Sequence, residues 1–167
     1  MKKLTWIGVG IVGLMGLVFL LNWATLKMTV SNRLSEDDRN EAVDLSIRYE
    51  YYLNPSVIAI SLNNCEAASP ADILRALLQK AESLQSREFS RVELHSGYTH
   101  KFILEGDYFQ VLGEEYDFQN PMYTARTLPE KVKEPDGTQA YHSLGGGLSG
   151  LSDQMENFNE FAVDWCK

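Results

Sequence analysis

The residues best suited to chemistry lie in the second half of the chain, around an arginine, a histidine and a glycine-rich segment. Arg126 stands in a run of apolar and hydroxyl side chains, where a guanidinium needs a carboxylate or an anionic ligand as its partner. His142 precedes the segment GGGLSG at Gly145–Gly150, whose backbone amides open an expected helix and can hold an anion. Arg126, His142, Gly146 and Gly147 therefore form our candidate binding site for a small anionic ligand.

Plainer structural roles stay open for the same residues. An internal salt bridge would satisfy Arg126 without any ligand. The glycine segment lacks the Gly-Lys-Ser/Thr of a phosphate-binding loop and the spacing of a dinucleotide-binding loop, so a tight turn before a helix explains it equally well. The sequence predicts no cofactor.

Carboxylates near the middle of the chain raise the question of hydrolysis. Glu114 and Glu115, with His142 as a further titratable group, are residue types that general acid–base catalysis uses. Neighbouring residues on a helix point about 100° apart, so Glu114 and Glu115 do not face each other, and a solvated acidic surface explains them as well. No Gly-x-Ser-x-Gly elbow is present. We assign no catalytic residue and keep a hydrolase built on these three groups as an alternative.

The histidines do not predict a metal site. Alternation of apolar residues around Ser96-Gly97 predicts an antiparallel hairpin in which Leu94 faces Phe102 and a three-residue loop closes the turn. In that register His95 and His100 lie on opposite faces of the sheet. The chain also lacks the Cys and His spacings of zinc sites. We therefore expect no metal.

The chain has two cysteines, Cys65 and Cys166. In an oxidising compartment an even pair of this kind is a disulfide candidate, and closing so long a loop stabilises a fold by roughly 4 to 5 kcal/mol. In a reducing compartment the same residues would stay as two thiols.

The N-terminal segment has the length and polarity of a membrane anchor. Leu4–Leu26 is a run of 23 residues without a charged side chain, long enough as a helix to cross a hydrocarbon core of ~30 Å. Trp6 and Trp23 bracket the run, as at the two faces of a bilayer. Small residues that suit signal peptidase are poorly placed, so we favour an uncleaved signal-anchor over a removed signal peptide.

The part of the chain beyond the anchor is acidic and has the length of one domain. The chain has 15 lysines and arginines and 23 acidic residues, and Lys2, Lys3 and Lys27 belong to the anchor, so 12 − 23 gives residues 28–167 a formal charge of −11. Such an acidic domain repels nucleic acid. We expect an anchor at 1–27, a linker at 28–42 and one globular domain at 43–167. Lys2 and Lys3 favour an N-terminus in the cytoplasm and an extracytoplasmic domain, periplasmic or extracellular.

Hydrophobic periodicity outlines the elements of the domain. We expect strands near 43–53, 57–62, 92–96 and 100–104, helices near 70–86, 107–116 and 148–165, and one more strand at Met122–Leu128. The helix after Ser69 has the firmest start, because serine, proline and aspartate form a capping box with proline in the first turn. This order predicts an α+β two-layer sandwich with an antiparallel sheet, for which ferredoxin-like connectivity is one compatible topology, closed by the C-terminal amphipathic helix.

These features together favour a single-pass membrane protein whose domain binds another protein or a peptide of a bacterial-type cell envelope. The alternatives are the hydrolase with Glu114, Glu115 and His142, and the binder of a small anion. The expected partners are the lipid bilayer, through Leu4–Leu26, and an envelope protein.

Overall fold

The computed structural model describes residues 16–18, 20, 24, 26, 38–142 and 147–167. The expected anchor, Leu4–Leu26, therefore lies for the most part outside the described residues. Of the helices in the described part, none has both the length and the apolar character that a bilayer span needs.

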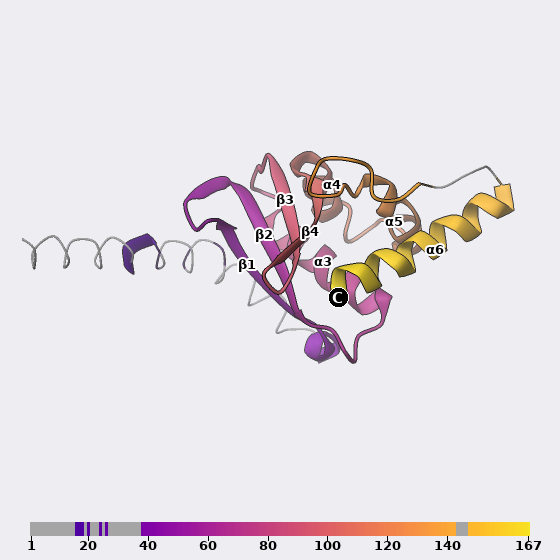
Figure 1. Cartoon of the computed structure of the whole chain (residues 1–167), viewed down its shortest axis with the longest axis horizontal. Helices are drawn as coiled ribbons and strands as arrows, with labels where there is room; N and C mark the ends of the chain where they lie inside the picture. Colours follow the sequence, from indigo (N-terminus) through magenta and orange to yellow (C-terminus); the bar gives the residue numbers. More distant parts are fainter. Residues whose placement is uncertain (1–15, 19, 21–23, 25, 27–37, 143–146) are drawn as a thin grey trace, which may run out of the picture.

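A four-stranded mixed sheet forms one layer of the fold, and helices form the other. The strands are β1 (Asp44–Glu50), β2 (Asn54–Asn64), β3 (Arg91–Ser96) and β4 (Thr99–Glu105), in the spatial order β1-β2-β3-β4. β1 and β4 run antiparallel to their neighbours, whereas β2 and β3 are parallel. Figure 1 shows the helices gathered on one side of this sheet. The α+β prediction is confirmed.

The prediction of a wholly antiparallel sheet is wrong at its centre. Helix α3 (Pro70–Leu84) connects β2 to β3, and a crossover of this length returns the chain to the end of the sheet where β2 began, so β3 runs parallel to β2. β2 and β3 are also direct neighbours. A ferredoxin-like split βαβ unit would hold another strand between them, so that topology does not apply.

Helix α3 starts as the sequence predicts, but it buries more of its surface than the apolar face alone. The Ser69 side chain accepts from the backbone of Asp72, whose carboxylate in turn accepts from the Ser69 backbone N–H at 2.9 Å. Gln79 and Lys80, which periodicity assigns to the polar face, are buried. Gln79 accepts from Asn40 of the 3-10 helix η2 (Asp38–Ala42) at 2.6 Å. This part of the expected linker therefore packs on α3.

The strand predicted at Met122–Leu128 is a helix. Helix α4 (Gly106–Glu114) is followed by α5 (Pro121–Thr127). The Asn120 side chain accepts from the Met122 backbone N–H at 3.0 Å and Pro121 occupies the first turn. An N-terminal cap with proline behind it is a helix start, so these local signals outweigh the short apolar run.

The last helix, α6 (Gly147–Cys166), closes over the sheet as predicted. Phe158, Phe161 and Trp165 are buried, and Phe161 lies with its ring centroid 5.6 Å from that of Phe102 on β4. Leu151 remains 37% exposed. The apolar stripe therefore contacts the sheet with the C-terminal half of the helix, the half that reaches the disulfide.

Close approach of α3 and α4 gives a testable prediction at Gly113. A Cβ atom at this position would lie 2.4 Å from the backbone oxygen of Ala81. Alanine is normally the better helix former by roughly 0.5 to 1 kcal/mol. Here, however, the added methyl group would clash with the backbone of α3, which cannot shift without loss of packing energy. We expect Gly113→Ala to lower the free energy of unfolding by about 1 to 3 kcal/mol, measured by urea titration.

Glu114→Ala, on the exposed end of the same helix, is the matched control and should change stability by no more than about 0.5 kcal/mol. A Gly113→Ala variant more stable than the parent protein would show that the two helices do not approach this closely.

Candidate functional site

Arg126 is held within the fold by a polar chain that links three elements. It lies half-buried in the last turn of α5, and its Nε donates to Gln154 Oε1 at 3.0 Å. The Gln154 amide in turn donates to Glu130 Oε1 at 3.1 Å. The carboxylate that an arginine in this setting needs is therefore reached through Gln154.

Of the other members of the predicted anion site, His142 and Gly147 lie in the described part of the chain. The side chain of His142 is exposed, and its carbonyl accepts from Asn157 Nδ2 at 3.2 Å. Gly147 begins α6, whereas Gly146 lies outside the described residues. Among the described residues no hydrogen bond or ion pair joins Arg126 to His142. The anion site stays a prediction.

The carboxylates of the hydrolase alternative have local partners. Glu114 accepts from Gln110 Nε2 at 2.9 Å and Glu115 from Gln119 Nε2 at 3.3 Å, both four residues away. Within the described part of the chain, no hydrogen bond or ion pair joins either carboxylate to His142. That alternative also stays a prediction.

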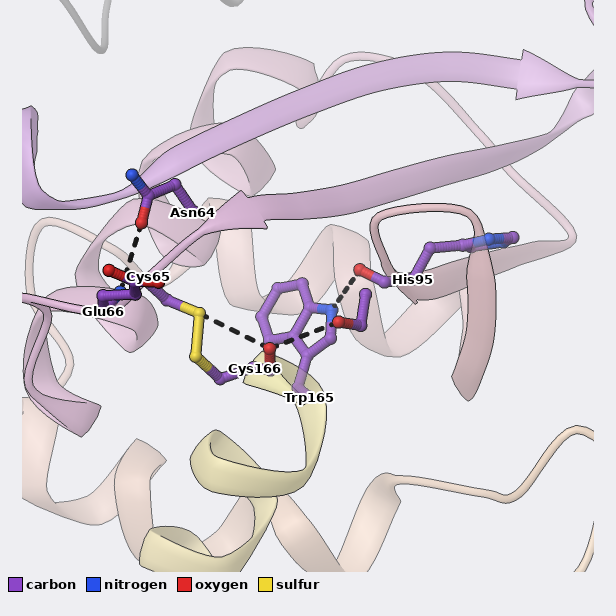
Figure 2. The surroundings of a disulfide bond; sticks show 7 residues. Asn64, Cys65, Glu66, His95, Trp165 and Cys166 are labelled. Atoms are coloured by element: carbon purple, nitrogen blue, oxygen red, sulfur yellow. Dashed lines mark hydrogen bonds between the residues drawn. A yellow bond between two sulfur atoms is a disulfide. The ribbon is translucent and has the colours of Figure 1, made fainter.

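A disulfide joins Cys65, just after β2, to Cys166 at the end of α6, with a Cα–Cα distance of 6.1 Å. Two hydrogen bonds fasten the same corner (Figure 2): Trp165 Nε1 donates to the His95 carbonyl at 2.9 Å, and Ser96 Oγ donates to the Cys166 carbonyl at 3.2 Å. The end of α6 is therefore tied to both β2 and β3.

A second cluster, which the sequence does not predict, lies on the sheet face opposite the helices. Glu93, His95 and His100 each offer a ligand atom within 4.8 Å of the other two. The imidazole rings of His95 and His100 are parallel, with centroids 4.9 Å apart. In Figure 2 the His95 ring extends away from Trp165, whose indole N–H donates to the His95 carbonyl.

A register shift between Leu94 and His95 brings the two histidines together. Leu94 pairs with Phe102 as predicted, but His95 pairs with His100, which leaves Lys101 as the extra residue of a bulge. The turn is one residue tighter than expected, and Gly97 takes a φ of +56° there. The prediction that His95 and His100 lie on opposite faces is therefore wrong.

Charge around the cluster is shared among several groups. Arg91 bridges two carboxylates, Glu50 at 2.8 Å and Glu93 at 2.9 Å, and His95 Nε2 lies 3.2 Å from the other oxygen of Glu93. Burial raises the pKa of Glu93, but the hydrogen bond with His95, the charge of His100 and the contact with Arg91 together lower it below its usual value. The Glu93 carboxylate is therefore ionised near neutral pH.

His95 is 6% exposed, and burial is the main cause that lowers its pKa; the charges of His100 and Arg48 lower it further, whereas Glu93 opposes them. A neutral imidazole is the form that these surroundings favour. Its Nδ1 is buried and has no hydrogen-bond partner in the described part of the chain.

An exposed apolar surface lies on α4, α5 and the loop between them. We define the α4–α5 patch by the side chains of Val111, Phe118, Met122 and Tyr123, each at least 40% exposed. A shallow groove beside it is lined by Leu78, Leu112, Glu115, Tyr116, Gln119, Pro121 and Thr124.

The geometry of these sites offers two chemistries. The cluster of Glu93, His95 and His100 consists of residue types that bind metal ions. The α4–α5 patch has the aromatic and methionine side chains that are enriched at protein interfaces. Arg126 is already bonded within the fold, through Gln154. Comparison with protein-family models, curated proteins and solved structures finds no match for this chain.

Proposed function

We propose that this chain is a single-pass membrane protein whose acidic α+β domain lies outside the cytoplasm and binds another protein of the cell envelope without catalysing a reaction. The observation that carries the proposal is the α4–α5 patch, where Phe118 is 76% exposed between two helices. Isolated apolar side chains on a surface are ordinary, but several of them beside a groove favour an interface.

Two features support the location. The bond between Cys65 and Cys166 suits an oxidising compartment, because thiols in the cytosol are kept reduced. The uncharged run Leu4–Leu26, with Lys2 and Lys3 before it, suits an anchor whose N-terminus stays in the cytoplasm.

The surroundings of the patch indicate the chemistry of its partner. Glu114, Glu115 and Asp117 lie in the same stretch of chain as Phe118, and two of these carboxylates are exposed. An apolar centre with acidic neighbours is complementary to a segment that carries apolar side chains flanked by lysine or arginine. We therefore assign the patch to such a segment of an envelope protein.

Site-specific photocrosslinking in intact cells tests this assignment. A photoreactive phenylalanine analogue at Phe118 should give a discrete crosslinked band whose partner is identified by mass spectrometry. Tyr98 is the matched control, because it is aromatic and 99% exposed. It lies in the turn before β4, at the opposite end of that strand from α4. We expect no discrete band from the analogue at position 98.

Charge removal separates a specific complex from chance contact. Glu114→Gln together with Asp117→Asn should reduce the Phe118 crosslink several-fold if the partner segment is basic, because complementary rim charges raise the association rate. Equal crosslinking from positions 98 and 118, or none from either, would refute the proposed interface.

A further inference from the structure

We infer that Glu93, His95 and His100 form a binding site for one divalent transition-metal cation of the zinc type, on the sheet face opposite the helices. This inference is independent of the proposed protein interface, since β3 and β4 supply all three residues and none of the α4–α5 patch is involved.

The residue types match the chemistry of such an ion. Imidazole suits zinc, copper, nickel and iron, and a carboxylate completes a common ligand set of two histidines and one glutamate. The ligand atoms of the three residues lie within 4.8 Å of one another.

One ligand pair already has the spacing of a shared ion. His95 Nε2 and Glu93 Oε2 are 3.2 Å apart, and two ligand atoms at the usual distances from a tetrahedral zinc ion lie about 3.4 Å apart. The ligand atom of the third residue, His100, must move closer to the other two. An imidazole donates in its ring plane, and the rings of His95 and His100 are parallel, so one ring must turn. His100 is only half-buried and lies next to the bulge, so it is the ring that turns.

The hydrogen bonds around the cluster must partly rearrange on binding, because His100 Nε2 lies 3.1 Å from the Phe102 carbonyl oxygen and leaves it when the ring turns. With Nε2 of His95 toward the ion, Nδ1 carries the proton, and this buried atom has no hydrogen-bond partner in the described part of the chain, whereas metal-binding histidines usually donate from that nitrogen. Arg91 holds Glu50 as well as Glu93. Arg91 therefore still has Glu50 as a carboxylate partner when Glu93 turns one oxygen toward an ion.

The backbone beneath the site is firmly held. The carbonyl of His95 accepts from Trp165 Nε1, and the neighbouring Ser96 is bonded to the carbonyl of Cys166. The C-terminal helix and its disulfide thus fix the β3 end that presents His95. Three protein ligands leave a fourth position of a tetrahedral ion for water.

Calorimetric titration of the untagged full-length chain in detergent micelles with Zn²⁺ tests the inference. We expect one ion per chain and an affinity at least about ten-fold weaker in His100→Ala and in Glu93→Gln, the scale on which loss of a supporting metal contact acts. His142→Ala, an exposed histidine outside the cluster, is the matched control and should bind as the parent does.

Two further readouts complement the calorimetry, and the second predicts a gain of binding that loss of folding cannot produce. Co²⁺ in place of Zn²⁺ should give visible absorption bands of a four-coordinate site, and these should vanish in His100→Ala. Arg48, whose charge acts on His95, opposes a cation, so Arg48→Gln should tighten binding. Zn²⁺ binding that is absent, or as strong in His100→Ala as in the parent chain, would overturn the inference.

Discussion

Replacing both Cys65 and Cys166 by serine should lower the free energy of unfolding by about 4 to 5 kcal/mol, measured by urea titration of the oxidised parent and the double variant. The two residues are 101 positions apart in sequence. A cross-link over a loop of this length removes conformational entropy mainly from the unfolded chain, and its contribution grows with the logarithm of the loop. Most domains have total stabilities of only about 5 to 15 kcal/mol, so the double variant should be close to unfolding at growth temperature.

Reduced parent protein is the control for this experiment, because it loses the bond without changing any side chain to serine. It should unfold at nearly the same urea concentration as the double variant. Burial of Trp165 and its hydrogen bond to the His95 carbonyl do not involve either sulfur atom, so the helix should still dock once the chain has folded without the disulfide. A loss below about 1 kcal/mol would mean that the unfolded chain is compact enough to hold the two ends together without the bond.

Local sequence signals predict the elements of this fold better than they predict how the elements are joined. The capping box at Ser69 and the pairing of Leu94 with Phe102 are present as expected. Asn120-Pro121 carries the same kind of cap and proline as Ser69-Pro70, yet a short apolar run after it favours a strand. Seven residues are too few for periodicity to separate the two structures, so the cap is the better guide.

The direction of β3 depends on a rule that acts between elements rather than within them. A helix between two strands that share a sheet makes them parallel when the strands are neighbours, and nothing within β2 or β3 records which strands are neighbours. The bulge at Lys101 is similar, because a single extra residue in β4 exchanges the face on which His100 lies. The candidate metal site depends on that one residue, so it cannot be predicted from a strict alternation of side chains between the two faces of the sheet.

Burial of polar residues on α3 is a third case in which tertiary structure overrides the local pattern. Periodicity assigns Gln79 and Lys80 to the solvent face, but η2 packs on this side of the helix and Asn40 bonds to Gln79. Lys80 is only 2% exposed. Desolvation lowers its pKa from 10.5 to about 8, against the opposing attraction of Asp44.

We expect Lys80→Met to stabilise the protein at pH 7, by up to about 3 kcal/mol. A lysine whose pKa is near 8 in the folded chain and 10.5 in the unfolded chain is charged in both states at pH 7, and the folded state bears a cost of about 1.4 kcal/mol for each pKa unit. Methionine has a similar shape and no charge to desolvate, so it removes that cost. Lys131→Met, on an exposed side chain, should change stability by no more than about 0.5 kcal/mol.

The stabilising effect of Lys80→Met should depend on pH, because the folded and unfolded chains release the Lys80 proton at different pH values. Between pH 8 and 10.5 the unfolded chain holds the Lys80 proton while the folded chain has released it, so the stability of the parent rises with pH relative to the variant. The advantage of Lys80→Met should therefore be complete below pH 8 and disappear by about pH 10.5. Urea titrations of both proteins at pH 7 and pH 10 measure the difference, and groups common to both cancel. A variant less stable than the parent at pH 7 would show that the attraction between Lys80 and Asp44 exceeds the cost of burying the ammonium group.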